Sequence, residues 1–277
     1  MMRRRDLLLT IGVALAWMVL PGTAYPQAAN EGAFCFVQIT DTHFGSGDHA
    51  ARTQTIVDRI NNLPMPIACA IHTGDLVSDD IADGHTLGIA TAALARIHVP
   101  VHVLPGNHDI LRTNLMATLS VYTNRVGPLC SRAEHNGVVF LLFYNEPLRK
   151  NFTVKGYDAL AWLEAALKEA GNKPVIVCLH SPPVEDFYDN RLHRGWKPEY
   201  QKRFVDLVNA APNVKAVLAG HFHRDELHWL GRVPLYVSSS VAGYWGRQGS
   251  FRVYEYRDGR LSYRTVYLEP PVEDSGD

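Results

Sequence analysis

Apolar runs of strand length alternate with amphipathic runs of helix length over the first two thirds of the chain. The segment 138–145, VVFLLFYN, is continuously apolar, which is typical of a strand covered on both faces. The segment 51–63 places Ile56, Ile60 and Leu63 on one face of a predicted helix. The pattern predicts an α/β body with strands at 33–40, 66–73, 101–105, 138–145, 174–180 and 214–220, and helices at 51–63, 85–97, about 109–122, 158–171 and 198–211.

The last sixty or so residues change character, because strand-like runs follow one another with no helix between them. The predicted strands cover 226–231, 233–240, 250–257 and 261–268. Asp258-Gly259 joins the last two and is a strong hairpin signal. An antiparallel meander that packs as a second sheet on the first is the simplest arrangement. Since no linker separates the two parts, we expect one domain, residues 30–277.

Residues 1–29 have the layout of a secretory signal peptide. Three arginines, Arg3 to Arg5, precede an apolar run from Leu7 to Leu20, which is shorter than most membrane spans. The pair Arg4-Arg5 resembles a twin-arginine signal, which predicts export to the periplasm or beyond. Cleavage is expected after Ala24 or near Ala28, and a retained membrane anchor is the alternative.

Composition narrows the classes of function. The 277 residues are 47% hydrophobic and 20% charged with a formal net charge of −1, so no basic surface for a nucleic-acid polymer is expected. Thirteen His residues suggest metal binding, although scattered surface His is the commoner meaning. The cysteines, Cys35, Cys69, Cys130 and Cys178, form no CxxC pair, which argues against a structural zinc site. We expect them to be buried packing residues, with a disulfide as the alternative.

Polar residues follow five predicted strands at the points where the strands end. In open α/β sheets, ligands bind beyond the carboxyl ends of the strands. Helix caps and turns explain one such loop, but five in succession point to a shared site. These strand ends read Asp41-Thr42-His43, Gly74-Asp75, Gly106-Asn107-His108-Asp109, His180 and Gly220-His221-Phe222-His223.

Carboxylate, amide oxygen and imidazole together suit ions such as Mn, Fe, Co or Zn. Two such ions ~3.5–4 Å apart need about four protein ligands each, with one carboxylate shared. His221 and His223 flank one residue, as in an extended segment in which both side chains face the same side. The candidate ligands are Asp41, His43, Asp75, Asn107, His180, His221 and His223.

The motifs DTH, GD, GNHD, a lone His before SPP, and GHFH, in this order, resemble the calcineurin-like metallophosphoesterases from Asp41 to His223. The resemblance implies a two-sheet β-sandwich flanked by helices, with a dinuclear metal site at the carboxyl ends of the strands. It places Asp41, His43, Asp75 and His223 on one ion, and Asp75, Asn107, His180 and His221 on the other.

The implied activity is metal-dependent hydrolysis of phosphoric esters. A water or hydroxide between the ions would attack phosphorus, and the ions would hold the phosphate oxygens. His108 is the candidate general acid for the leaving oxygen. Asp109 could orient His108 or cap the following helix.

The chain departs from the protein phosphatases of this fold, which read GD-x-x-D-R-G and GNHE. Here Ser78 occupies the position of the usual carboxylate partner and Asp79 follows one place later, which leaves the His–Asp pairing open. The pattern is more similar to bacterial class III cyclic-nucleotide phosphodiesterases and related small-diester hydrolases. We therefore expect a phosphodiesterase that acts on a small phosphoester, with no stable membrane insertion after signal cleavage. The alternatives are a phosphomonoesterase or protein phosphatase of the same fold, or a non-catalytic metal-dependent binding protein.

Substrate contacts are expected on the long segment after His180, because long loops beside a site often form binding walls. A merely solvated loop is the alternative. In segment 242–249, Tyr244, Trp245 and Arg247 are expected to pack on a hairpin, and His72 and His228 to be satisfied sheet residues. The candidate substrate contacts are Arg191, His193, Arg194 and Trp196.

Overall fold

The computed structural model describes residues 33–79, 81–188 and 193–268, all of which belong to one compact unit. The predicted signal peptide and Arg191 lie outside the described residues. Within the described ranges, no helix combines the length and the apolar character needed to cross a membrane.

The described elements follow the predicted alternation closely. The strands are β1 (Phe34–Ile39), β2 (Ile67–His72), β3 (Val101–Val103), β4 (Cys130–His135), β5 (Val138–Phe143), β6 (Val175–Cys178), β7 (Val214–Ala219), β8 (Glu226–Leu230), β9 (Val233–Val237), β10 (Ser250–Arg257) and β11 (Arg260–Tyr267). The helices are α1 (His49–Asn61), α2 (Gly84–Ala95), the 3₁₀ turn η1 (Arg112–Asn114), α3 (Leu115–Arg125), α4 (Glu146–Lys150), α5 (Ala159–Ala170) and α6 (Pro198–Ala210).

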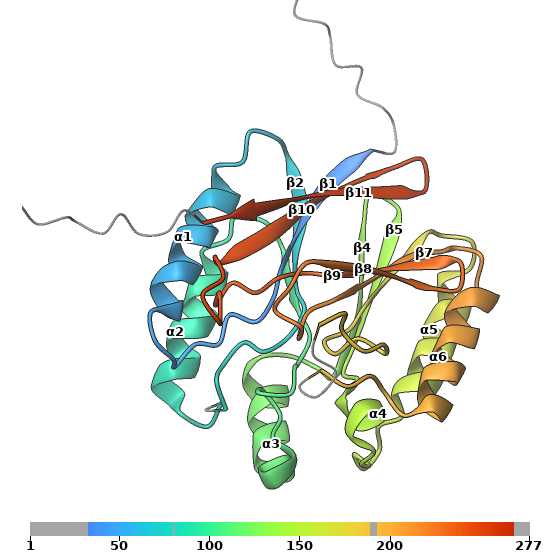
Figure 1. Cartoon of the computed structure of the whole chain (residues 1–277), viewed down its shortest axis with the longest axis horizontal. Coiled ribbons are helices and arrows are strands. Elements are labelled where there is room, and N and C mark those ends of the chain that lie inside the picture. The colour runs from blue at the N-terminus through green and yellow to red at the C-terminus, as the bar shows by residue number, and fades with distance from the viewer. Residues whose placement is uncertain (1–32, 80, 189–192, 269–277) are drawn as a thin grey trace, which may run out of the picture. The chain divides into compact units, whose positions relative to one another are not determined.

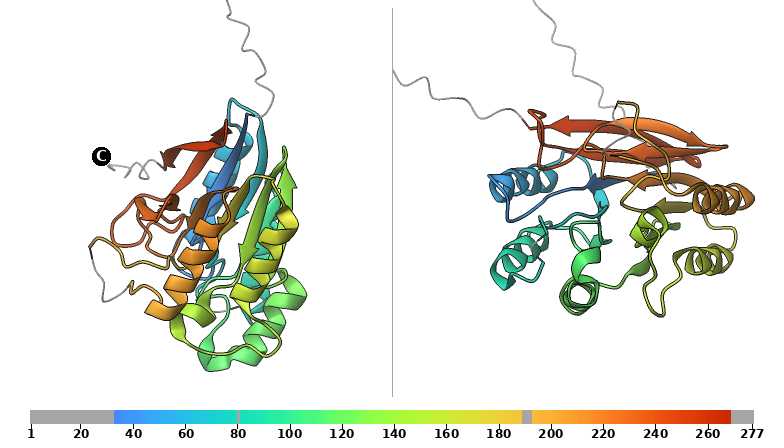
Figure 2. Two further views of the ribbon diagram at one scale, coloured as in Figure 1. Left: turned by 90° about the vertical axis from the view of Figure 1, so that its right-hand side faces the viewer. Right: turned by 60° about the horizontal axis from the view of Figure 1, so that its bottom comes forward.

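Two sheets face each other, with helices on their outer sides (Figures 1 and 2). One sheet has the strand order β11-β10-β1-β2-β3, and the other has the order β4-β5-β6-β7-β9-β8. Helices α1, α2 and α3 pack on the first sheet, and α5 and α6 pack on the second. The predicted two-sheet sandwich flanked by helices is confirmed.

The prediction that the C-terminal strands form a sheet of their own is wrong. Strand β9 extends the second sheet by pairing parallel to β7, whereas β10 extends the first sheet by pairing antiparallel to β1. Strands β1 and β7 are both apolar and almost wholly buried, so each needs a neighbour on its open edge. The connection 238–249 therefore crosses from one sheet to the other. The predicted hairpin is confirmed, since Asp258 and Gly259 have φ angles of 51° and 76°.

An apolar layer fills the space between the sheets. The Phe36 ring stacks on Tyr254 at 5.0 Å and meets the edge of Phe140 at 5.1 Å, so the three rings join both sheets. Cys69 and Cys178 are buried in this layer. All four cysteines are free thiols, but the prediction that they are buried is wrong for Cys35 and Cys130, which are partly exposed.

Two predictions near the site need correction. The helix expected from about residue 109 begins only at Arg112, as a 3₁₀ turn that leads into α3. Asp109 does not cap it, because the carboxylate turns inward and accepts hydrogen bonds from the N–H groups of Gly106 (2.8 Å) and Val77 (3.1 Å). Strand β4 and the short helix α4 were not predicted.

Candidate metal centre

The site lies where five parallel strands from both sheets end. The turns after β1 and β2 are joined by backbone hydrogen bonds, in which the N–H of Asp41 donates to Gly74 (2.9 Å) and that of His43 donates to Asp75 (3.1 Å). The turn after β7 joins them across the sheets, because the N–H of His221 donates to Asp41 Oδ2 (3.0 Å). Backbone groups thus fix the positions from which the predicted ligands project.

The motif glycines permit this close approach. A Cβ on Gly74 would lie 2.7 Å from His180 Nδ1, which no real side chain tolerates. A Cβ on Gly106 would overlap the carboxylate of Asp75, and one on Gly220 would overlap Thr40. The glycines of the GD, GNHD and GHFH motifs are therefore required because the neighbouring atoms leave no room for a Cβ.

Backbone strain is concentrated here. Positive φ angles are uncommon in residues other than glycine, and cost of order 1–2 kcal/mol in most side chains. The site residues with φ between 47° and 70° are Asp41, His43, Asp75, Asp79, His221 and His223. The extended conformation predicted for 221–223 is therefore wrong. His221 joins Asp75 and His180, whereas His223 joins Asp41 and His43.

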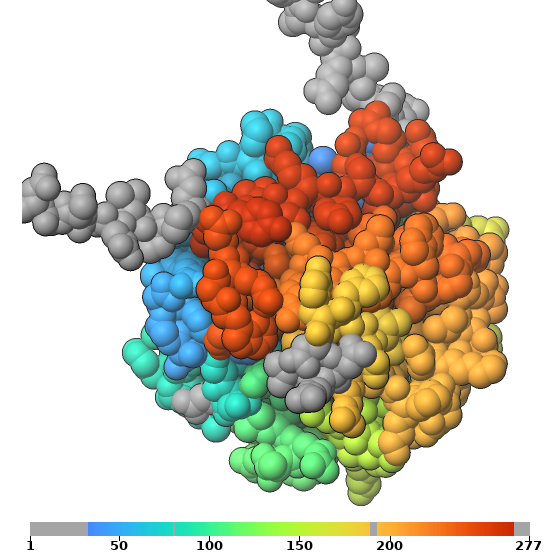
Figure 3. Space-filling model, viewed as in Figure 1, coloured from blue at the N-terminus to red at the C-terminus, as the bar shows by residue number. Residues whose placement is uncertain are grey.

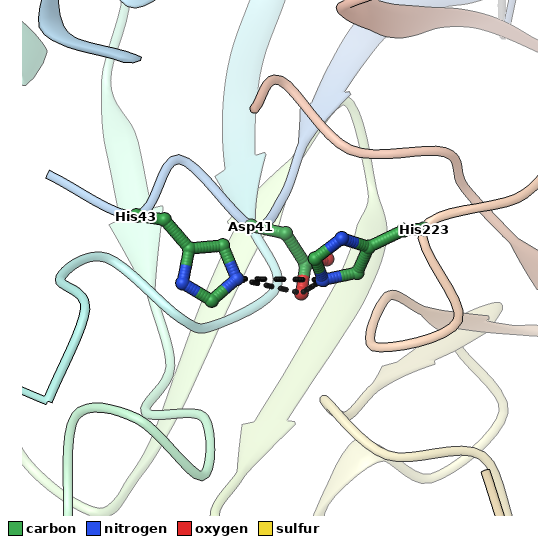
Figure 4. Close-up of side chains that lie close together, drawn as sticks. All are labelled: Asp41, His43 and His223. Atoms are coloured by element: carbon green, nitrogen blue, oxygen red, sulfur yellow. Dashed lines mark hydrogen bonds and ion pairs between the residues drawn. The ribbon is translucent and has the colours of Figure 1, made fainter. Parts of the chain in front are cut away.

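The first donor group consists of Asp41, His43 and His223 (Figure 4). The two imidazoles approach Asp41 Oδ1 from either side, with Nε2 of His223 at 3.0 Å and Nε2 of His43 at 3.8 Å. The other oxygen of Asp41 accepts from the Thr40 hydroxyl at 2.6 Å as well as from the His221 N–H. Only Oδ1 is therefore left to face the imidazoles.

The second donor group consists of Asp75, His180 and His221. Nε2 of His180 lies 3.1 Å from Asp75 Oδ2. Nδ1 of His180 faces the Thr73 carbonyl at 2.8 Å, so Nδ1 must carry a hydrogen and donate to it. In the neutral imidazole, the lone pair is then on Nε2 and is available to bind a metal ion. Asp75 Oδ2 is also 3.7 Å from Nε2 of His43, so this carboxylate lies between the two groups.

The residues present fit divalent cations. Asp41 Oδ1, Asp75 Oδ2 and the Nε2 atoms of His180 and His221 are buried and have no hydrogen-bond partner among the described residues. Burial acts to raise the pKa of Asp41, but the facing His223 outweighs it, and the pKa falls to about 2. Burial acts to lower the pKa of His180, but Asp75 raises it to about 10. Both shifts reflect the attraction between each buried carboxylate and the imidazole that faces it.

Six of the seven predicted ligands lie in these two groups, and Asn107 lines the same cavity. The Asn107 Oδ1 atom accepts a hydrogen bond from Arg149 Nη2 at 3.3 Å. The structure thus brings all seven residues together, while their coordination of ions stays a prediction.

His108 is oriented by Asp79. Nδ1 of His108 lies 2.7 Å from Asp79 Oδ1, and the His108 ring centroid is 4.9 Å from that of His43. The left-handed conformation of Asp79 compensates for its position one residue beyond the usual partner, so the His–Asp pairing exists in this chain. Asp109, whose carboxylate is turned towards Gly106 and Val77, is not its partner. Burial acts to lower the pKa of His108, but Asp75 and Asp79 raise it.

A cavity of about 520 Å³ opens over both donor groups and His108. The segment after β9 supplies Tyr244 and Trp245 to its wall, beside the segment after β6 (Figure 3). Tyr244 stacks on His223 at 5.0 Å, and Trp245 is 58% exposed. The expectation that these two rings pack on a hairpin is wrong, because the segment crosses between sheets instead of forming a tight turn.

The segment after His180 contributes to the cavity in part. His193 lines it, held by Asp186 Oδ2 at 2.6 Å. Trp196 does not line it: the ring is 5% exposed, packs on Phe204 at 5.1 Å, and donates from Nε1 to the Ser181 carbonyl. The chain turns back into the core at Trp196 to begin α6, so its predicted substrate role is wrong. Arg194 is exposed and does not line the cavity.

Sequence reasoning missed the polar residues after β5. Asn145 Oδ1 accepts the N–H of His180 at 2.9 Å and its amide donates to Ser181 at 2.7 Å, so it fixes the turn that carries His180. Glu146 and Arg149 follow in α4. A signal was available, since Asn145 and Glu146 directly follow the continuously apolar run that forms β5. His72 and His228 are satisfied, as predicted, by Thr42 and Glu226.

Comparison with known proteins decides the family. The family model for calcineurin-like phosphoesterases matches residues 35–225. The chain belongs to this family. The phosphoesterase is 27% identical over 206 residues to the glycerophosphodiester phosphodiesterase GpdQ of Enterobacter lignolyticus, covering 67% of this chain and 69% of that protein. It is 25% identical over 210 residues to a 3',5'-cyclic-nucleotide phosphodiesterase of Nostoc, covering 70% of this chain and 75% of that protein.

A solved structure supports the fold. The dimetal phosphatase of Danio rerio superposes with a TM-score of 0.63 at 14% identity, covering 85% of this phosphoesterase and 99% of that chain. At this identity the likeness concerns the fold alone. Family, fold and donor groups together make the chain a metal-dependent phosphoric ester hydrolase, as the motifs predicted.

The position of Asp75 between the two groups gives a test of the metal centre. We expect Asp75→Ala to lose both ions together, because the variant removes the carboxylate that lies between the two groups. Asp79→Asn is the control, since it changes a carboxyl group of the same cavity that belongs to neither group. Elemental analysis that finds two tightly held ions in purified Asp75→Ala would exclude Asp75 as the bridge.

Proposed function

We propose that this phosphoesterase hydrolyses small phosphodiesters and that His108 protonates the leaving oxygen. The observation that carries the proposal is the His108–Asp79 pair, 2.7 Å apart, beside both donor groups in one cavity. The names of the two relatives, a glycerophosphodiester phosphodiesterase and a cyclic-nucleotide phosphodiesterase, support a diester substrate.

The proposed ligands form two sets, one for each metal ion, as the resemblance of the motifs implies. Mn, Fe, Co and Zn all suit this mixture of carboxylate, amide and imidazole donors. When bound, a pair of such ions lowers the pKa of water and offsets negative charge on the phosphoryl oxygens. Asp41, His43, Asp75 and His223 would hold one ion, and Asp75, Asn107, His180 and His221 the other.

The remaining chemistry belongs to His108. Asp79 pairs with Nδ1, so the ring is held in one orientation and Nε2 is left for the substrate. A proton on Nε2 can pass to the leaving alkoxide, which would otherwise depart as a strong base. Asp75 accepts the backbone N–H of His108 at 2.8 Å, which ties the acid to the metal centre.

A phosphomonoesterase is the second candidate, favoured by one observation. Arg149 and Lys150 line the cavity, and two positive charges suit the dianion of a monoester better than the monoanion of a diester. The exposed Trp245 ring in the same cavity instead suits a second, apolar substituent on phosphorus.

Two chromogenic substrates separate these candidates. We expect metal-loaded enzyme to hydrolyse bis(p-nitrophenyl) phosphate with a higher kcat/KM than p-nitrophenyl phosphate, because the second ring can contact the aromatic wall. The reverse order would replace the phosphodiesterase proposal with the monoesterase.

Removal of His108 tests its role. We expect His108→Ala to keep both metals and to slow hydrolysis of an alkyl diester by about 10²–10⁴-fold, the usual worth of a positioned general acid. Hydrolysis of the nitrophenyl diester should lose far less, because nitrophenolate leaves without a proton. Asp79→Asn should show the same dependence on leaving group, with smaller losses. Equal losses on both substrates, with metal content intact, would mean that His108 does not protonate the leaving oxygen.

We further propose that the chain is exported by the twin-arginine route, on the basis of Arg4-Arg5. This route carries folded proteins, so the metal centre would be assembled before export. Changing Arg4 and Arg5 to Lys should leave the precursor in the cytoplasm, as fractionation and immunoblotting would show. Normal amounts of mature protein in the periplasm of the variant would indicate another route.

A further inference from the structure

Arg149 lines the cavity but belongs to neither donor group. Its side chain is only 8% exposed, and arginine is seldom so buried unless its charge is paired. We propose that Arg149 binds a non-bridging oxygen of the phosphoryl group, and so is a substrate-binding residue of this site. The inference deepens the proposed function and rests on it.

The guanidinium is held in a fixed orientation by Glu146. Nε of Arg149 lies 3.1 and 2.9 Å from the two Glu146 oxygens, and Nη2 lies 2.7 Å from Oε2. Glu146 is itself buried and accepts a hydrogen bond from the Ser181 hydroxyl. Such a two-point pair removes the freedom that an arginine otherwise loses when it binds a ligand.

The same geometry shows which donors remain. A guanidinium has five N–H groups, and Glu146 occupies the edge made by Nε and Nη2. The outer hydrogen of Nη2 points to Asn107 Oδ1, 3.3 Å away, a residue of the cavity wall. Within the described part of the chain, Nη1 makes no hydrogen bond. The unused donors are therefore the two N–H groups of Nη1, which lies next to the Nη2 that donates to Asn107 at the cavity wall.

The N–H groups of Nη1 carry part of the guanidinium charge and can donate to a non-bridging oxygen of a phosphoryl group. A purely structural role would need only the pair with Glu146, because that pair alone neutralises the charge, and Glu146 already connects α4 to Ser181. The place of Arg149 beside Asn107 thus puts a permanent positive charge where the phosphate would meet the second donor group.

Affinity for inorganic phosphate tests this directly, because it does not depend on turnover. Phosphate is titrated calorimetrically into protein at metal concentrations that saturate each variant. We expect Arg149→Ala to bind phosphate about 10- to 100-fold more weakly, the usual worth of a charged hydrogen-bonding pair. Arg149→Lys should recover part of the loss, since it keeps the charge without the guanidinium N–H groups. Arg203→Ala, which removes an exposed charge on α6, should bind as the wild type does.

Two further variants remove the effect of an unpaired buried carboxylate. Glu146→Gln keeps the guanidinium but weakens the pair that orients it, so it should lose less phosphate affinity than Arg149→Ala does. The double variant Glu146→Gln/Arg149→Gln removes both charges together and should show the same loss as Arg149→Ala. Wild-type phosphate affinity in Arg149→Ala or in the double variant, at saturating metal, would overturn the proposal and leave Arg149 as a residue that positions Asn107.

The outcome is separable from that of the proposed function. A preference for p-nitrophenyl phosphate over the diester would overturn the phosphodiesterase proposal, while the phosphate titrations would still decide the role of Arg149.

Discussion

Two carboxylates, Asp41 and Asp75, are buried in the seam between the sheets, and each uses only one oxygen for hydrogen bonds to the protein. The second oxygen of each faces imidazole nitrogens. Taking ionised carboxylates out of water costs several kcal/mol each unless positive charge compensates them. The site therefore requires cations or protonated imidazoles, and the turns around it serve to bring these groups within reach.

The need to bring compensating positive groups to these carboxylates explains the backbone strain in the turns. Left-handed residues and glycines at van der Waals limits are unfavourable locally, and persist only where the surrounding structure over-determines them. Here the surroundings are three apolar clusters, one between the sheets and one beneath each helical layer. The hydrogen bonds from the His221 N–H to the Asp41 carboxylate and from the Asp41 N–H to the Gly74 carbonyl then fix the turns of the two sheets relative to each other. The buried core is thus what holds a site of like-charged and strained groups together.

Much of the fold could be predicted, because strands such as β5, β6 and β7 are buried on both faces and carry an apolar signal in their own sequence. The sheet that β10 joins could not be predicted, because its partner strand β1 lies more than two hundred residues away in the sequence. The metal-site residues could be predicted because they follow the ends of the predicted strands. Their backbone conformations could not be predicted, because the left-handed conformations of His221 and Asp79 are imposed by tertiary contacts. Trp196 was predicted to contact substrate but is buried in the core, and Trp245 was predicted to pack on a hairpin but lines the cavity. Local sequence does not determine whether a ring lies in the core or in the cavity.

The segment 238–249 connects the aromatic wall of the cavity to the first donor group. Its backbone N–H groups at Val241 and Ala242 donate to the carbonyls of Thr40 and Asp41, which carry the first donor group. A few residues later Tyr244 stacks on His223 and contacts His43 at 5.1 Å. The wall that faces the substrate and the ligands of one metal therefore belong to one braced unit. A substitution that reshapes this wall also shifts the imidazoles behind it, so substrate preference and metal affinity are expected to change together on this side of the cavity. Elsewhere in the cavity, Arg149 pairs with Glu146, which accepts from the Ser181 hydroxyl, and it donates to the proposed ligand Asn107. The aromatic and the cationic lining of the cavity are thus each tied to proposed metal ligands, the first through ring contacts and backbone hydrogen bonds and the second through one side-chain hydrogen bond.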